Sequence, residues 1–131
     1  MEYLKKCYDE ALAVAPDVIV GLSVGTRPDC LDADKVALLE SYCDRWDVDV
    51  EMGMESIYDI TLQQINRGCS HQEFVDAVAL FANSPIDLCI HTVFGFPGET
   101  NEMMLQYIHE INRFPQIKFV KFHHLHIVRV R

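Results

Sequence analysis

The sequence lacks any apolar run of the length that a membrane-spanning helix requires, about 18 residues or more. Basic residues are also scarce, since 11 lysines and arginines stand against 20 aspartates and glutamates, for a net charge of −9. Such a surface repels phosphate backbones and anionic lipids, which argues against a nucleic-acid or membrane partner. Acidic residues interrupt the N-terminal segment before any apolar stretch, unlike in a secretory signal, and we expect a cytoplasmic protein.

Closely spaced cysteines are absent as well. No two of the five cysteines lie nearer than 13 positions along the chain, so neither a zinc ribbon nor a disulfide framework is indicated. We expect reduced thiols, most of them buried as small apolar side chains. These residues are Cys7, Cys30, Cys43, Cys69 and Cys89.

Half of the 131 residues are hydrophobic, which suffices for one continuous core in a single domain. Apolar residues recur at helical spacing in five segments, and the segments between them read as strands. The expected helices cover 2–14, 33–46, 59–66, a segment from Ser70 and a segment from about Thr100; the expected strands cover 18–24, 48–54, 86–94 and 119–127. The order predicts an α/β fold with four parallel strands, either an open doubly wound sheet or part of a (β/α) barrel.

One strand favours the barrel. In the segment after Trp46, acidic residues alternate with apolar ones, so one face of the strand is acidic and the other apolar. Helices cover both faces of an open parallel sheet, whereas a barrel lumen accepts a polar face. The alternative is that Asp47 and Asp49 merely lie near the solvated start of the strand. The acidic set is Asp47, Asp49, Glu51 and Glu55, and the next strand repeats the pattern more weakly with Asp87, Cys89 and His91.

The carboxyl ends of the strands are where ligands bind in parallel α/β proteins. The turn Gly95-Phe96-Pro97-Gly98-Glu99-Thr100 combines glycines, a stiffening proline and a helix start, so its backbone could hold a small polar ligand. The alternative is a tight turn with a structural role only. Arg27 and Arg67, also in predicted loops of this edge, could bind a carboxylate or form surface ion pairs.

Two further classes of function stay open from the residues alone. His124 and His126 share a face of the last predicted strand, and with His91 they could bind a metal in a TIM-barrel hydrolase. A histidine cluster that lines the core or lumen is the alternative for the same residues. The other class is a non-catalytic α/β interaction module.

Several motifs together resemble one family. The segments TRPDC, EMGMES, INRG, HTVFGFPGET and KFHHLH occur in the order and spacing typical of the radical S-adenosylmethionine superfamily. The similarity extends from about Val18 to Val128 and points to the iron–sulfur oxidoreductase branch related to the elongator-type and coproporphyrinogen enzymes.

The resemblance implies a partial (β/α)6 barrel that binds a [4Fe–4S] cluster and S-adenosylmethionine, which is cleaved to a 5′-deoxyadenosyl radical. Glu55 stands where the family often has a Gln facing the cofactor, and Arg67 resembles the arginine that pairs with the cofactor carboxylate. His91 takes a position where relatives can hold an acid that reaches the nucleoside. The turn 95–99 resembles the one that packs near the adenine. The implied cofactor-binding residues are Glu55, Ser56, Arg67, His91, Gly95, Pro97, Gly98 and Glu99.

The departures from the family are equally specific. The C-x3-C-x2-C loop that binds the cluster and the Gly-Gly-Glu segment that grips the methionine amine are both missing, and Gly25 replaces a Glu. We therefore expect residues 1–131 to form the second part of a barrel whose cluster-bearing strands are absent, inactive alone and with an unassigned substrate. The chain is expected to stop at Val130-Arg131 in or just past a strand. The unpaired edge strands of such a piece predict self-association into a dimer or higher oligomer.

Overall fold

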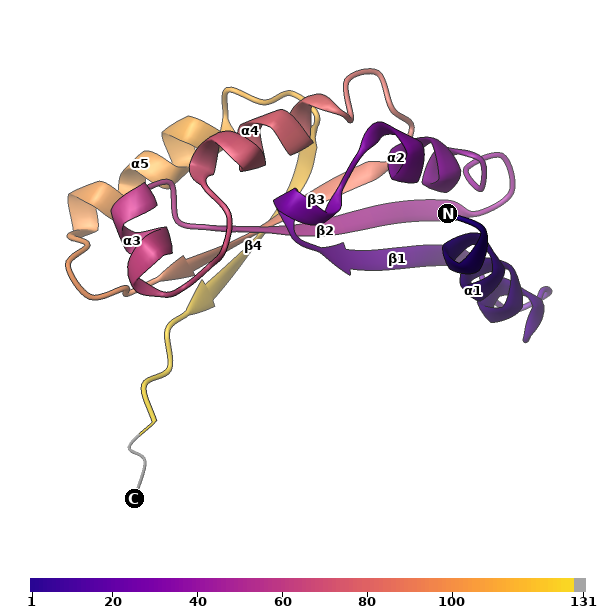
Figure 1. Cartoon of the computed structure of the whole chain (residues 1–131), viewed down its shortest axis with the longest axis horizontal. Helices are drawn as coiled ribbons and strands as arrows, with labels where there is room; N and C mark the ends of the chain where they lie inside the picture. The colour runs from indigo at the N-terminus through magenta and orange to yellow at the C-terminus, as the bar shows by residue number, and fades with distance from the viewer. Residues whose placement is uncertain (129–131) are drawn as a thin grey trace.

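The computed structural model describes residues 1–128 as helices that alternate with the strands of one sheet (Figure 1). In chain order the elements are α1 (Glu2–Ala13), β1 (Gly21–Thr26), the 3-10 helix η1 (Pro28–Cys30), α2 (Ala33–Glu40), β2 (Asp47–Glu55), α3 (Asp59–Gln64), α4 (His71–Ala79), β3 (Asp87–Phe94), α5 (Asn101–Ile111) and β4 (Ile117–His124).

The four strands pair in chain order, β1-β2-β3-β4, and every pair is parallel. Each crossover contains at least one helix: α2 joins β1 to β2, α3 and α4 join β2 to β3, and α5 joins β3 to β4. All carboxyl ends of the strands therefore meet at one edge of the sheet. The predicted parallel α/β fold is confirmed.

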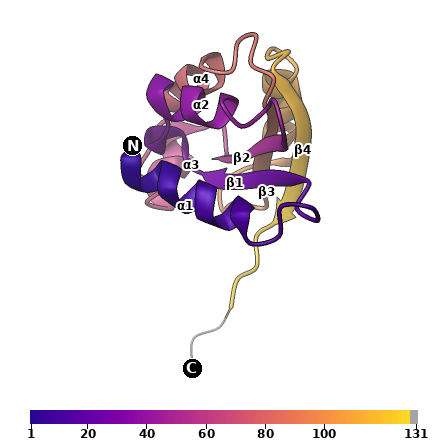
Figure 2. The same ribbon diagram turned by 90° about the vertical axis from the view of Figure 1, so that its right-hand side faces the viewer.

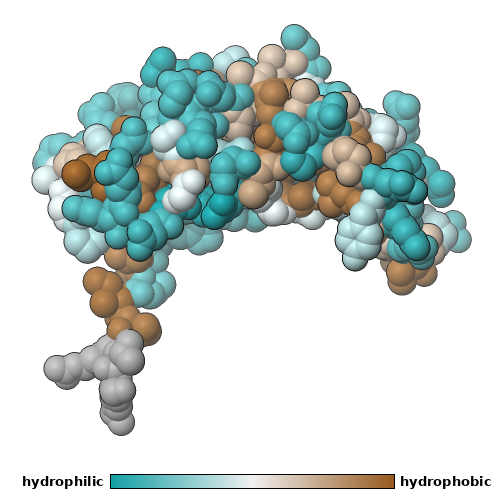
Figure 3. All heavy atoms as spheres, in the orientation of Figure 1, coloured by the Kyte–Doolittle hydropathy of each residue, from teal (hydrophilic) through white to brown (hydrophobic). Residues whose placement is uncertain are grey.

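Helices α2 to α5 lie on one face of the sheet, and α1 lies across its amino-terminal end (Figures 1 and 2). The hydroxyl of Tyr42, in the turn after α2, holds α1 by donating to the Asp9 carboxylate at 2.7 Å. The opposite face of the sheet is not covered by these helices, and the space-filling view shows an arched outline that is hollow on that side (Figure 3). One-sided coverage agrees with the predicted partial TIM-like barrel and differs from an open, doubly wound sheet.

The core lies between the helix layer and the sheet. From the two central strands, Val50, Met52, Leu88 and Ile90 are completely buried. Burying side chains of this size stabilises the fold by about 1.5–3 kcal/mol each. The helices contribute Val36, Leu39, Phe74, Val78 and Tyr107 to the same core.

The first strand begins later than the sequence predicts. Val18 and Val20, expected inside the strand, are each 77% exposed, and the amide of Val18 instead donates to the Ala15 carbonyl at 2.9 Å. The turn that Pro16 imposes therefore extends to this point, and β1 pairs with β2 only from Gly21 onward.

Other boundaries also differ from the predictions. The helix expected at 33–46 ends at Glu40, and tighter turns continue it, with the amide of Cys43 donating to Glu40 at 3.0 Å. The strand expected at 119–127 covers 117–124 instead. The predicted capping box of Ser70 and Glu73 is present at the start of α4. Val130 and Arg131 lie outside the described residues.

Among residues 1–128, the edge strands β1 and β4 each have a neighbour on one side only, and apolar side chains are exposed along β4 at Phe119 and Phe122. Of the helices within residues 1–128, none is long and apolar enough to cross a membrane.

Candidate functional site

Polar residues of the two central strands gather on the uncovered face of the sheet. Along β2 the residues under the helices are buried, whereas Asp49 and Glu51 on the other face remain partly exposed. Asp49 accepts a hydrogen bond from the Ser23 hydroxyl at 2.9 Å, across the β1–β2 pair. The acidic face that the sequence predicts thus lines the hollow, although Asp47 lies exposed at the strand start.

Glu55 and Arg67 meet on the same face, at the carboxyl end of β2. The Arg67 Nη2 atom lies 3.5 Å from Glu55 Oε1 and donates to the Gly53 carbonyl at 3.0 Å. Gly53 pairs with His91, and a Cβ at Gly53 would overlap Glu55 Oε1 and lie 2.6 Å from Arg67 Nη2. The ion pair therefore occupies the space above Gly53 that any other residue would fill.

Local backbone geometry brings these two side chains together. A register shift between Gly53 and Glu55 leaves Met54 unpaired, and Glu55 adopts a positive φ of 63°. Arg67 follows α3, where its amide donates to the Leu62 carbonyl at 2.9 Å, and Gly68 with a φ of 81° then redirects the chain toward α4.

The Glu55–Arg67 pair is shielded from water, with 20% and 17% of the two side chains exposed. The Nε atom of Arg67 is buried and has no hydrogen-bond partner among residues 1–128. A buried donor without a partner costs about 1–3 kcal/mol, so this guanidinium is suited to bind an acceptor from a ligand. Arg27, by contrast, is paired in its own loop with Asp29.

The turn after β3 is fixed to the end of β2 through its glutamate. The Glu99 carboxylate accepts hydrogen bonds from the Ser56 hydroxyl at 2.6 Å and from the hydroxyl of Tyr107. Ser56 and Tyr107 are fully buried. Burial, and to a smaller extent the hydrogen bond to Glu99, raises the pKa of Tyr107, so the Tyr107 hydroxyl stays protonated and acts as the donor. In this arrangement the side chains of Ser56 and Glu99 hold the turn in place.

Gly95 and Gly98 adopt φ values of 96° and 91°, which L side chains rarely reach, so the turn requires both glycines. Together with Pro97 and residues of α3, Gly98 lines a depression of about 490 Å³ at the carboxyl edge. The Thr100 hydroxyl caps α5 by accepting from the Met103 amide at 3.3 Å.

A further polar cluster lies on the hollow face around His91. Its Nε2 atom is 2.9 Å from Glu51 Oε2, and its Nδ1 atom is 3.2 Å from Nε2 of His123. Lys121 contacts the other oxygen of Glu51. The hydrogen bond from Lys121 holds the pKa of the Glu51 carboxyl below its ordinary value and raises the pKa of Lys121. From the sequence, Glu51 is expected on the acidic face and His91 at the cofactor, whereas Lys121 and His123 occur only within the motif KFHHLH.

The three histidines of the hydrolase hypothesis do not come together. His124 lies on the helix side of β4, beside Phe94 and Met104 of an apolar groove, whereas His91 faces the hollow. His126 is exposed beyond the end of β4. No group of three His, Cys, Asp or Glu side chains able to hold a metal ion occurs within the described part of the chain.

The cysteines are equally dispersed. Cys89 is buried, Cys43 and Cys69 are partly buried, and burial raises the pKa of all three thiols. Cys7 and Cys30 are exposed. These residues do not fit a [4Fe–4S] cluster, which needs several thiolates around one position.

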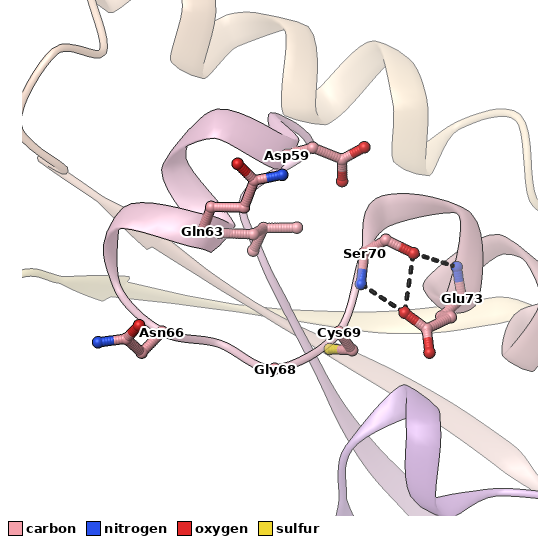
Figure 4. Close-up of a pocket in the computed structure, with 8 residues that line it drawn as sticks. Asp59, Gln63, Asn66, Gly68, Cys69, Ser70 and Glu73 are labelled. Carbon is pink, nitrogen blue, oxygen red and sulfur yellow. Dashed lines mark hydrogen bonds between the residues drawn. The ribbon is translucent and has the colours of Figure 1, made fainter.

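A second groove, of about 500 Å³, lies between α3 and α4 (Figure 4). The Glu73 carboxylate in this groove already accepts hydrogen bonds from the amide and the hydroxyl of Ser70, as part of the capping box of α4. Cys69 and Asn66 also line this groove, and none of the residues predicted to bind the cofactor does. The hollow face and the carboxyl edge of the sheet are therefore the better candidate for a functional site.

Known proteins are similar to this chain over nearly its whole length. The model of the radical SAM superfamily matches residues 2–111. Protein MJ0486 of Methanocaldococcus jannaschii is 32% identical over 129 residues, which are 98% of this chain and 39% of that protein. Protein YhcC of Escherichia coli is 34% identical over 130 residues, again 98% of this chain and 41% of the relative. The chain thus spans about two fifths of the length of these relatives.

Two solved structures share the fold. An N-terminally truncated Elp3 of the archaeon Methanocaldococcus infernus is 28% identical and superposes with a TM-score of 0.68, over 81% of this chain and 25% of its own. TsrM of Kitasatospora setae, a radical S-adenosylmethionine methyltransferase with cobalamin and a [4Fe–4S] cluster bound, superposes with a TM-score of 0.70 at 19% identity, over 93% of this chain and 24% of its own.

Gly53→Ala should destabilise the protein by about 1 kcal/mol, the low end for added side-chain volume, because the methyl group displaces only the flexible ends of Glu55 and Arg67. Urea denaturation measures the change in the free energy of unfolding. Gly25→Ala is the matched control, since a Cβ at this strand glycine meets nothing within 4 Å. Equal effects of the two substitutions would contradict the close-approach role of Gly53.

Proposed function

This chain belongs to the radical SAM superfamily, and from that membership we propose that it forms part of a barrel that binds S-adenosylmethionine at the carboxyl ends of its strands. The observation that best supports the proposal is the shielded Glu55–Arg67 pair, which borders the hollow and keeps one guanidinium donor unpartnered within residues 1–128. In this proposal the hollow face of the sheet is the inner wall of the barrel.

Each implied binding residue has a chemical task in the proposal. The planar fork of Arg67 binds the cofactor carboxylate, for which it has a free Nε donor, and Glu55 accepts from an amine or hydroxyl. His91, the partner of Gly53 in the β2–β3 pair, faces the same hollow and hydrogen-bonds the nucleoside. The backbone of Gly95, Pro97 and Gly98 packs near the adenine.

Ser56 and Glu99 act differently from the other implied residues. The Ser56 hydroxyl donates to Glu99, and Glu99 also accepts from Tyr107. In the proposal these two side chains therefore position the turn, and the backbone of the turn contacts the cofactor. The same turn borders the depression of about 490 Å³ at the carboxyl edge, which offers room for a ligand.

The [4Fe–4S] cluster is not held by this chain in the proposal, because its cysteines lie far apart in sequence and do not gather among the described residues. The chain spans 39% of MJ0486 and 41% of YhcC, and we place the cluster ligands of such proteins in the part that it does not cover. Together with the cluster, S-adenosylmethionine is the source of the 5′-deoxyadenosyl radical in the activity proposed for the whole protein.

Titration with S-adenosylmethionine followed by NMR should shift the signals of Glu55, Arg67 and His91. Arg67→Gln should weaken binding roughly tenfold or more, because a hydrogen bond to a charged group contributes about 1.5–3 kcal/mol. Arg45→Gln is the control, since Arg45 lies over the Trp46 ring at the other end of β2. Shifts confined to residues outside the carboxyl edge would refute the proposed site.

Anaerobic reconstitution with iron and sulfide should leave the isolated chain without the visible absorption of a [4Fe–4S] cluster, and the chain alone should not cleave S-adenosylmethionine. The reason is that no set of thiolates can surround a cluster here. Iron analysis and product chromatography measure the two outcomes. A stoichiometric cluster on the monomeric chain would show that our reading of the cysteines is wrong.

We also propose that the chain self-associates through its open edges. Free edge strands present unpaired amides and carbonyls, and Phe122 adds an exposed apolar side chain on β4. Light scattering at tens of micromolar should detect a dimer or higher oligomer, and Phe122→Lys should shift it toward the monomer. Ile60→Lys is the control, because Ile60 is at least as exposed as Phe122 but lies on α3, away from both edges. A monodisperse wild-type monomer would exclude self-association.

A further inference from the structure

Four polar side chains on the hollow face form one connected chain of contacts. Lys121 contacts Glu51, Glu51 contacts His91, and His91 contacts His123, so the set spans β2, β3 and β4. We propose that His91 is a proton-accepting residue for a ligand bound in the hollow, with Glu51 as its orienting partner and His123 as a movable cover on its basic nitrogen.

The contacts determine which nitrogen of His91 is basic. An ionised carboxylate only accepts hydrogen bonds, so the Nε2 atom of His91 donates to Glu51 Oε2 across 2.9 Å. The Nδ1 atom of the neutral ring then carries the lone pair. It accepts a hydrogen bond from the Nε2–H group of His123 across 3.2 Å. Because Lys121 holds the pKa of Glu51 below its ordinary value, the carboxylate stays ionised near neutral pH.

A carboxylate that orients an imidazole whose second nitrogen is unprotonated is the arrangement that general bases use. The carboxylate fixes the tautomer and stabilises the imidazolium that forms when the second nitrogen takes a proton. Charged and titratable groups near this set come from each packed strand: Asp49 and Glu51 from β2, Cys89 from β3, and Lys121 and His123 from β4. The Glu55–Arg67 pair lies over Gly53, the β2 partner of His91.

His123 is suited to move away from His91. Its side chain is exposed, the two rings lie at 35° with centroids 5.0 Å apart, and one hydrogen bond joins them. His91 itself is more protected, with 24% of its side chain exposed. Rotation of His123 would therefore open the Nδ1 atom to the hollow, while Glu51 and Lys121 keep the ring of His91 in place.

The ligand class follows from this chemistry. A molecule with an acidic O–H or N–H group would transfer that proton to Nδ1 of His91, and its electron pair would stay on the ligand oxygen or nitrogen. The Nε2 proton would remain hydrogen-bonded to Glu51, so the ring becomes an imidazolium beside an ionised carboxylate. The proposal depends on the proposed function only in that a ligand occupies the hollow.

Two measurements on the chain without any ligand test the inference, so its failure is separable from failure to bind S-adenosylmethionine. Two-bond proton–nitrogen NMR correlations should show His91 as the Nε2–H tautomer, and Glu51→Gln should produce a mixture of tautomers. An Nδ1–H tautomer of His91 in the wild type would overturn the proposal. The wild-type tautomer alone decides this test, so the result stands even where Glu51→Gln disturbs the fold.

Diethyl pyrocarbonate acylates histidine nitrogens that have a free lone pair, and mass spectrometry measures the rate at each site. His91 should react slowly in the wild type and roughly fivefold or more faster in His123→Ala, since the net contribution of one hydrogen bond is about 1 kcal/mol. His124→Ala is the matched control, because His124 lies on the other face of β4. His123 is exposed, so its loss should leave the fold intact.

An unchanged His91 rate in His123→Ala, or an equal increase in His124→Ala, would overturn the covering role of His123. Titration with zinc alone separates the remaining explanation, in which the two facing nitrogens bind a metal. Stoichiometric zinc binding that both His91→Ala and His123→Ala abolish would overturn the proposal, because the lone pair would then serve a cation. Absence of such binding supports the proton-accepting role.

Discussion

The two-sided character of β2 is the constraint on which the rest of the structure depends. Val50 and Met52 on one face are completely buried, so the helix layer must pack there. Asp49 and Glu51 on the other face are charged, and burial under a second helix layer would remove their hydration without enough partners. The sheet therefore takes helices on one side and leaves a polar hollow on the other (Figures 1 and 3).

Charges in the hollow are stabilised by neighbours on adjacent strands. Glu51 contacts Lys121 and His91. Glu55 pairs with Arg67 in the space that Gly53 leaves free. At the carboxyl edge a second carboxylate, Glu99, takes hydrogen bonds from buried hydroxyls and fixes the turn after β3. The same carboxylates that could repel one another thus hold the strand ends in one arrangement.

Membership in the radical SAM superfamily gives this arrangement a functional context. The matched region of the relatives is about two fifths of their length, and residues 1–128 present a polar sheet face without a set of cysteines that could bind a cluster. Our proposals divide the work accordingly: Arg67 and Glu55 bind the cofactor, Ser56 and Glu99 position the turn, and His91, covered by His123, contacts the ligand in the hollow through its basic nitrogen.

The sequence by itself determined the parallel α/β order, the acidic face of β2, the capping box at Ser70 and the glycine-containing turn at 95–100, because each depends on local periodicity or on residue types close in the chain. It also placed Glu55 and Arg67 at the same edge. Only the tertiary structure decided that they pair, since that contact requires the register shift after Gly53. Likewise, alternation along β4 separates His123 from His124, but pairing with β3, with its irregularity at Leu88, decides which one faces His91. Strand register is a long-range property, and a shift of one residue moves a side chain to the opposite face.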